Sequence, residues 1–203
     1  MNIIKSVIVM VSLGFSTVAF SATNVAAGAV VTLNGTFGGS DSVWGAGSIA
    51  AGSTLTDNNF LPTSTQWNLG TVYWFGGANA GGTSFFPANS IQIDLGGQYS
   101  IESLTLQADD NDAYPVLYRN GASDPWQSIW NAPVVGGFGM QTRSLSSLSI
   151  VATSFLLGNG NGDGYYGVSE FQAFGAPVPE PETYVMLLAG LGLLGFIGRR
   201  KMS

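Results

Sequence analysis

The sequence predicts an all-β protein, an antiparallel β-sandwich or jelly roll, flanked by an N-terminal signal helix and a C-terminal single transmembrane helix. Three observations support this fold class. Short runs of alternating apolar and polar residues recur through the middle of the chain. Clusters of Gly, Asn, Asp, Ser and Pro separate these runs, and no stretch between them sustains a helical period. Each end carries an apolar segment beside basic residues.

Residues 1–21 have the features of a secretory signal peptide. Lys5 places a positive charge before an almost uncharged apolar run, Val7–Phe20. Small residues follow where signal peptidase requires them, so we expect cleavage after Ser21 or after Ala22. The alternative is an N-terminal membrane anchor, for which the run is short. Export, with signal peptidase as a processing partner, is therefore predicted.

Residues 22–177 are predicted to form one β domain, with strands in the following order. They are Ala29–Leu33, Thr71–Phe75, Ser90–Leu95, Ile101–Gln107, Tyr114–Tyr118, Trp126–Trp130, Ser149–Leu156 and Gly167–Phe174. The third strand is the clearest, because its apolar residues at odd positions from Ile91 to Leu95 alternate with Gln92 and Asp94. One face of this strand should therefore lie in the core and the other in solvent.

The last predicted strand contains an acidic residue in an unusual place. Alternation puts Glu170 on the same face as Val168 and Phe174, so a carboxylate shares a face with apolar side chains. Burying a lone charge is very costly. We therefore expect Glu170 to be hydrogen-bonded, bound to a metal ion, or paired with Arg119 or Arg143.

The composition excludes most familiar enzyme chemistry. The chain has no His and no Cys, which removes His-based and Cys-based nucleophile systems, Cys/His zinc sites and disulfides. Between Lys5 and Arg199 there are two arginines, no lysine and all twelve acidic residues, a net charge of −10. This excludes nucleic-acid capture and lysine nucleophiles. Glycoside hydrolysis by two carboxylates facing one cleft stays open.

The C-terminal segment, residues 178–203, has three parts in a fixed order. They are the triplet Pro179, Glu180 and Pro181, the apolar stretch Tyr184–Gly198, and the basic cluster Arg199, Arg200 and Lys201. The prolines keep the approach extended, so we expect a linker over residues 175–182. The apolar stretch is predicted to be a transmembrane helix, with the basic cluster retained on the cytoplasmic side of the inner membrane.

This ordered ending resembles the PEP-CTERM sorting signal of Gram-negative bacteria, also catalogued as the C-terminal domain of an ice-binding protein. The resemblance rests on the Pro-Glu-Pro triplet and the basic end. It implies recognition by an exosortase while the precursor is anchored in the inner membrane. Delivery to the cell surface or to the exopolysaccharide matrix would follow. A plain C-terminal anchor is the alternative, although such an anchor needs no Pro-Glu-Pro triplet.

A second likeness rests on the strand Ile91–Gly96 and the closing segment Val168–Gly175. They resemble the discoidin-type, galactose-binding-like jelly roll, and the resemblance covers residues 51–175. It implies a carbohydrate-binding module. In such modules a structural Ca²⁺ joins an early Asp-containing loop to a Glu in the final strand. By this resemblance, Asp57 and Glu170 occupy those two positions.

Aromatic residues are one group of candidates for glycan binding. Sugar faces stack on exposed aromatic rings, which makes Tyr73, Trp74 and Trp126 candidates. A strand through Tyr73, Trp74 and Phe75 must place rings on both faces, so at least one of them should be exposed or covered by a loop. The alternative is that these rings fill the core.

Clustered acids are the other group, with Asp109, Asp110 and Asp112 as the candidate residues. The cluster fails as an EF-hand loop, because the required Gly and Glu are missing from the sixth and twelfth positions. Its oxygen ligands suit Ca²⁺ or the hydroxyls of a sugar. The alternative is a solvated turn, which Asp and Asn favour.

The sequence predicts a noncatalytic exported protein that an exosortase sorts to the cell envelope or the exopolysaccharide matrix, where it binds glycans. One alternative is a structural biofilm or surface protein with a protein partner. The other is a carboxylate-based glycoside hydrolase. No cofactor is expected beyond the Ca²⁺ that the resemblance implies.

Overall fold

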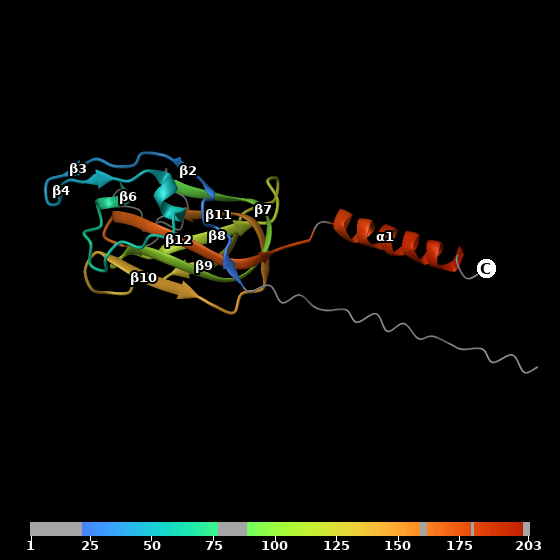
Figure 1. Ribbon diagram of the computed structural model, residues 1–203. Helices are drawn as coiled ribbons and strands as arrows, with labels where there is room; N and C mark the ends of the chain where they lie inside the picture. The colour runs from blue at the N-terminus through green and yellow to red at the C-terminus, as the bar shows by residue number, and fades with distance from the viewer. Residues whose placement is uncertain (1–21, 77–88, 159–161, 180, 201–203) are drawn as a thin grey trace, which may run out of the picture.

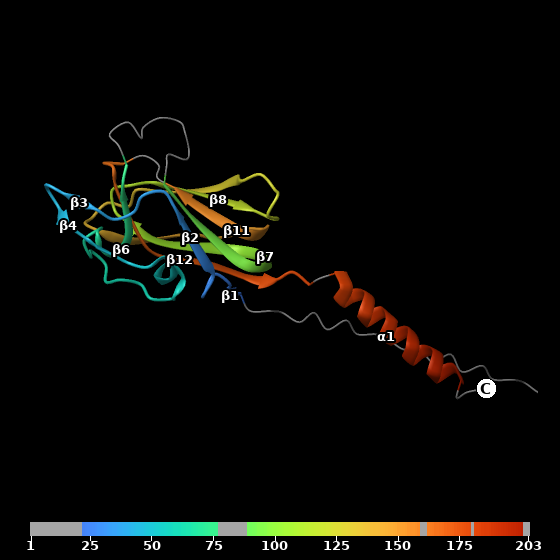
Figure 2. The ribbon, with the colours of Figure 1, turned by 90° about the horizontal axis from the view of Figure 1, so that it is seen from above.

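The computed structural model describes residues 22–76, 89–158, 162–179 and 181–200, which form a two-layer β-sandwich followed by one α-helix (Figures 1 and 2). The predicted signal peptide lies outside the described residues, as do Glu180 and Lys201 of the predicted sorting signal. The β3–β4 hairpin lies at one end of the sandwich, and α1 extends from the other.

The elements follow one another along the chain with these bounds. They are β1 Thr23–Asn24, β2 Val30–Asn34, β3 Ser40–Asp41, β4 Gly45–Ala46, β5 Ser48–Ile49, the 3₁₀ helix η1 Gly52–Thr56, β6 Leu69–Phe75, β7 Ser90–Asp109, β8 Tyr114–Arg119, β9 Gln127–Ala132, β10 Met140–Leu145, β11 Ile150–Gly158, β12 Tyr165–Pro177 and α1 Pro181–Arg200. Among the described strands, every pairing is antiparallel except that of β5 with β6. The all-β, antiparallel sandwich predicted from the sequence is confirmed.

The long strand β7 belongs to both layers. Its first part, Ser90–Asp94, pairs with β2 on one edge and β11 on the other. Its last part, Leu104–Asp109, pairs with β10 and β12. The chain bends between them at Gly96, whose φ of 73° is accessible to glycine at little cost. The sequence predicts two strands here because the glycines punctuate the pattern, whereas the chain turns the corner as one strand.

The hydrophobic core lies between the layers. Ile91, Ile93 and Leu95 of β7 are buried, as their alternation predicts. Phe155 of β11 meets Phe171 of β12 across the core, with ring centroids 5.2 Å apart. Burying a side chain of this size contributes roughly 1.5–3 kcal/mol. Contacts of this kind hold the two layers together.

The alternation in β12 differs from the prediction because of a β-bulge. The register with β7 shifts between Val168 and Glu170. The extra residue changes the phase of the strand, so Val168, Phe171 and Ala173 all join the core. Glu170 therefore shares a face with Gln172 and not with Val168. Side chains alternate between the two faces of a strand, so the one extra residue of a bulge moves all later side chains to the opposite face. The sequence alone does not mark where this happens.

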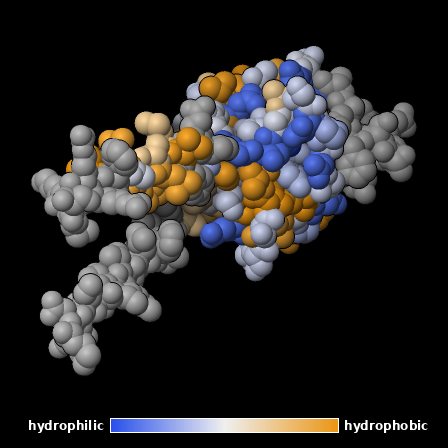
Figure 3. All heavy atoms as spheres, turned by 90° about the vertical axis from the view of Figure 1, so that its right-hand side faces the viewer, coloured by the Kyte–Doolittle hydropathy of each residue, from blue (hydrophilic) through white to orange (hydrophobic). Residues whose placement is uncertain are grey.

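The linker predicted at residues 175–182 is also corrected. Strand β12 runs to Pro177, and the N–H of Val178 still donates to the carbonyl of Gln98 at 2.9 Å. Helix α1 then begins at Pro181. The described part of the α1 surface is largely hydrophobic (Figure 3). Within the described ranges, no helix is both long enough and apolar enough to cross a membrane. The transmembrane helix stays a prediction.

Candidate functional site

A pocket of about 310 Å³ opens on the outer face of the layer formed by β7, β8 and β11, beside the bend of β7. It is lined by Asp94, Gly96, Gly97, Arg119, Ala122, Thr153 and Ser154. Asp94 lies on β7, opposite the core-facing residues of that strand, and Ser154 pairs with it from β11. Arg119 is the last residue of β8 and also pairs with Ser154. The strand register therefore brings together residues that are far apart in the chain.

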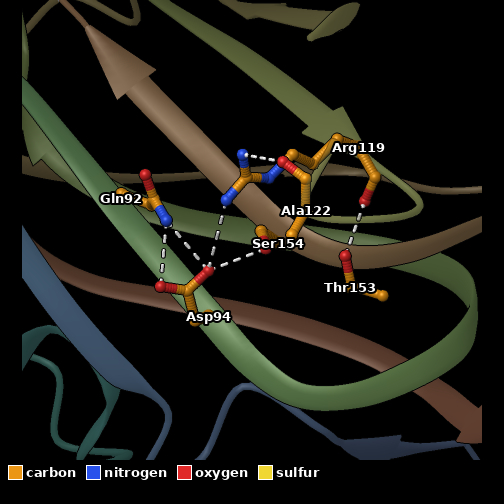
Figure 4. A network of polar contacts seen from close by, with 6 residues as sticks. All are labelled: Gln92, Asp94, Arg119, Ala122, Thr153 and Ser154. Carbon is orange, nitrogen blue, oxygen red and sulfur yellow. Dashed lines mark hydrogen bonds and ion pairs between the residues drawn. The ribbon is translucent and has the colours of Figure 1, made fainter. Parts of the chain in front are cut away.

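The carboxylate of Asp94 is the centre of the polar network in this pocket (Figure 4). It accepts from Nε2 of Gln92, at 3.0 and 2.9 Å to its two oxygens, and from Oγ of Ser154 at 2.7 Å. Nη2 of Arg119 lies 3.9 Å away. The Asp94 side chain nevertheless stays 37% exposed and that of Arg119 17% exposed. An ion pair of this length that is still partly open to solvent contributes little to folding, about 0–1 kcal/mol, so its main effect here is to orient the two charged groups.

The guanidinium of Arg119 is also held from its other sides. It lies 4.5 Å from the centroid of the half-buried Trp126 ring, and its Nη1 donates to the carbonyl of Ala122 at 2.9 Å. Its buried Nε has no hydrogen-bond partner among the described residues. The pocket thus combines a carboxylate acceptor with a guanidinium donor, and the Trp126 ring packs against that guanidinium without itself lining the pocket. Groups of this kind can bind the hydroxyls of a ligand.

Of the aromatic residues singled out from the sequence, Trp126 contacts the pocket residue Arg119, although it is not itself one of the residues that line the pocket. Tyr73 and Trp74 are each only 1% exposed. Trp74 stacks on Tyr166 with centroids 5.4 Å apart, and Tyr73 packs edge-on against Trp67 at 5.3 Å. Both faces of β6 are covered, so the expectation that one of these two rings serves as a ligand platform is wrong. Core filling, the alternative, describes them.

The clustered acids are buried rather than presented to solvent. Asp109 and Asp112 are buried and Asp110 is half-buried. Burial raises the pKa of Asp109 to about 7, with a further contribution from the charge of Asp110. Burial likewise raises the pKa of Asp112 to about 8, with a contribution from Asp163. Asp109 and Asp112 are therefore closed to a sugar, and the solvated-turn interpretation fails for them as well.

The buried acids belong to a network that sequence reasoning missed, formed by Asp109, Asp112, Tyr114 and Arg143 and called here the Asp-Arg network. Nη2 of Arg143 donates to the carbonyl of Asp109 at 2.5 Å. Its guanidinium lies 5.5 Å from the centroid of the Tyr114 ring. Oδ2 of Asp112 has no partner among the described residues. Strand β10, which carries Arg143, was not predicted, because its mostly polar sequence lacks the apolar alternation that marks a strand.

Asp57 lies near enough to Glu170 for its charge to act on that carboxyl group. Burial raises the pKa of Glu170 to about 7, and the charge of Asp57 contributes to the rise. Oε1 of Glu170 accepts from Nε2 of Gln172 at 3.3 Å, whereas its buried Oε2 has no partner in the described part of the chain. A buried carboxylate oxygen without a partner fits a cation ligand. Asn58, with φ of 67°, adjoins the pair, and its backbone hydrogen bond to Glu170 limits the rise in pKa.

The arrangement around Glu170 also limits what a metal ion could use. Within the described ranges, no group of three or more His, Cys, Asp or Glu side chains is placed to hold a metal ion. A Ca²⁺ ion here would need backbone or amide oxygens as its other ligands. Neither arginine pairs with Glu170 among the described contacts, because Arg119 lies beside Asp94 and Arg143 belongs to the Asp-Arg network.

Comparison with protein families matches the tail of the chain. Residues 177–201 match the PEP-CTERM protein-sorting motif. The match confirms the resemblance seen in the sequence and indicates an exported protein that is anchored by its C-terminal tail before processing. No curated protein matches the chain.

Several solved structures are similar to the chain. One is chitosan-binding module 1 of a chitosanase/glucanase from Paenibacillus sp. IK-5, at 16% identity over 74% of this chain and 98% of that chain, with a TM-score of 0.47. Another is the family 32 carbohydrate-binding module of NanJ from Clostridium perfringens in complex with galactose, at 13% identity over 76% and 98% of the two chains, with a TM-score of 0.46. The sandwich assignment rests on the strand pairings described above.

Proposed function

We propose that this chain is an exported, noncatalytic glycan-binding protein whose binding site is the pocket at Asp94 and Arg119, together with the adjoining Trp126 ring that packs against Arg119. The observation that carries the proposal is the position of the Arg119 guanidinium, held between a partly exposed carboxylate and an indole ring. Sugars offer vicinal hydroxyls to such charged groups and an apolar ring face to the indole. The two glycines at the bend of β7 leave the pocket open to the sugar.

The composition of the pocket favours binding over hydrolysis. Glycoside hydrolysis requires two carboxylates, roughly 5–9.5 Å apart, on either side of the bond. Asp94 is the one carboxylate among the residues that line the pocket. The groups of the pocket can therefore orient a sugar but cannot supply the acid and base of the reaction.

The tail supports the cellular part of the proposal. A sorting motif at residues 177–201 fits processing by an exosortase, followed by delivery to the cell surface or to the exopolysaccharide matrix of a Gram-negative bacterium. A glycan-binding domain at that location would hold the protein to the polysaccharide after the tail is cut.

Isolated residues 22–178 should bind at least one bacterial or commercial polysaccharide, and Trp126→Ala and Asp94→Asn should each weaken that binding about tenfold or more. A tenfold change corresponds to about 1.4 kcal/mol, the size expected for a lost stacking contact or charged hydrogen bond. A glycan array followed by calorimetric titration measures the change. Trp44→Ala, in the β3–β4 turn, and Asp124→Asn, in the β8–β9 turn, are the matched controls.

Two results would contradict this proposal in different ways. Equal binding by the wild type and both pocket variants would show that the pocket is not the binding site, although the protein would still bind glycans. Release of reducing sugars from the bound polysaccharide would favour the hydrolase instead.

We further propose that Asp57 and Glu170 hold a structural Ca²⁺ ion, together with oxygens of the neighbouring backbone and amides. The ion would neutralise two nearby carboxylates and so tie the loop after η1 to β12. Adding Ca²⁺ to metal-free protein should raise its melting temperature by about 5–10 °C at a concentration 100-fold above the dissociation constant. Glu170→Gln should abolish the rise, whereas Glu102→Gln, at an exposed position, should not. A wild-type melting temperature that does not change when Ca²⁺ is added would rule out the proposed Ca²⁺ site.

A further inference from the structure

The end of β12 is fastened to the bend of β7 up to the edge of the sorting motif. Gly175, Ala176 and Pro177 pair with residues of β7 from Ile101 back to Tyr99. The N–H of Val178 adds one more bond, to the carbonyl of Gln98 at 2.9 Å. The ladder ends there because proline has no N–H, so residue 179 cannot continue it. The sequence thus places the last bond of the domain directly before the motif.

This fastening leaves very little free chain before α1. Among the described residues, Val178 is the last with a backbone hydrogen bond to the sandwich, and Pro181 is the first residue of α1, so positions 179 and 180 lie between them. Two extended residues span about 7 Å. If the bonds from Gly175 to Val178 open, six residues become free, which span about 20 Å. The length of chain that a processing enzyme can grasp therefore depends on whether this end of β12 is paired.

We propose that residues 175–178 act as a latch, and that the processing enzyme gains access to the sorting motif when this latch lifts from β7. The inference rests on the proposed sorting role of the tail. The enzyme breaks one peptide bond of the tail and transfers the acyl group to water or to an amine, and the latch takes no part in that step. It sets how often the substrate segment is long enough to enter the active site.

The latch is built to open without unfolding the domain. Ala176 and Val178 are only half-buried and Pro177 is exposed, so lifting them uncovers little apolar surface. Gly175 is buried and also pairs with Thr23 of β1, so opening the latch breaks this short edge pairing as well. The core-facing residues of β12 end at Ala173, before the latch begins. Gly175 is the close contact that seats it, because a Cβ at this position would lie 2.1 Å from the backbone oxygen of Ser100.

Two variants of the full-length chain test the latch. A flexible insert of six Gly and Ser residues between Val178 and Pro179 lengthens the free segment and leaves the latch paired. Gly175→Ala forces the end of β12 away from the Ser100 backbone and leaves the spacing unchanged. In cells that express a cognate exosortase, a pulse-chase of precursor and product should show each variant processed at least about fivefold faster, the factor expected when even one net hydrogen bond of the latch no longer has to open.

The controls separate the latch from the sorting role itself. The same six-residue insert after Ser123, in the exposed β8–β9 turn, should leave the processing rate unchanged. Hydrogen exchange at the Val178 amide, measured without exosortase, should be faster in Gly175→Ala than in the wild type. Equal processing of the wild type and the Val178 insert would overturn the latch and leave sorting in place. Failure of every variant, wild type included, to be processed would overturn both.

Discussion

Replacing Asp112 by Asn should raise the melting temperature at pH 8 and reduce, without abolishing, the fall in stability between pH 4 and pH 8, because Asp109 and Glu170 also have raised pKa values. The pKa of Asp112 rises from 3.8 to about 8 in the folded protein, mainly because the side chain is buried. The folded state therefore binds more protons than the unfolded state throughout that window. The free energy of unfolding must fall as the pH rises through it and then level off above pH 8.

The size of this effect follows from the shift. One pKa unit corresponds to about 1.36 kcal/mol, so the rise at Asp112 sets an upper limit on the order of 6 kcal/mol. Asn keeps the acceptor that Oδ1 of Asp112 offers to the N–H of Asp163, which lies 3.2 Å away. Scanning calorimetry from pH 4 to pH 9 measures the effect, with Asp124→Asn as an exposed control. A wild-type melting temperature that rises with pH over this range would contradict the prediction.

Replacing Arg143 by Met should destabilise the domain by about 3–5 kcal/mol at pH 8 and by less at pH 5. Removing one partner of a buried set of charges leaves the others uncompensated, which costs about that much. At pH 8 Asp109 is largely ionised and Asp112 is partly ionised, whereas at pH 5 both are protonated. Met keeps the length of the aliphatic stem, so the change mainly removes the charge and the bond to the Asp109 carbonyl.

A double variant gives the sharper test of this second effect. Adding Asp112→Asn to Arg143→Met removes charges of both signs, so the pair should lose much less stability than the sum of the single changes. Urea unfolding at pH 8 supplies the free energies. Strict additivity, or a loss below about 1 kcal/mol for Arg143→Met, would show that the Asp-Arg network does not act as a unit.

Alternation and turn residues were enough to place the main strands, because they report directly on which side chains face a core. The sequence could not show that β7 carries the ladder around a corner at Gly96, or that the bulge at Ser169 changes the phase of β12. The apolar pattern of the strand is the same before and after the corner in β7, and before and after the bulge in β12. The corner and the bulge change only how the two halves of each strand are connected.

The candidate site was less accessible to sequence reasoning. Trp126 was recognised as a possible stacking ring, but Asp94 was seen only as the polar face of a strand and Arg119 only as a partner for Glu170. Their contact depends on β11, which pairs with β7 on one edge and with β8 on the other. Tyr73 and Trp74 failed as surface rings because segments distant in sequence cover both faces of β6.

The tail and the β3–β4 turn lie at opposite ends of the sandwich. Val178 leaves the sandwich beside Gln98, one residue from the pocket glycine Gly97. At the far end of the sandwich, the β3–β4 turn carries Val43, exposed on the surface, and Trp44, which meets the exposed ring of Phe138. The pocket glycines therefore lie near the end of the sandwich from which the tail leaves, whereas the apolar β3–β4 turn lies at the end away from the tail.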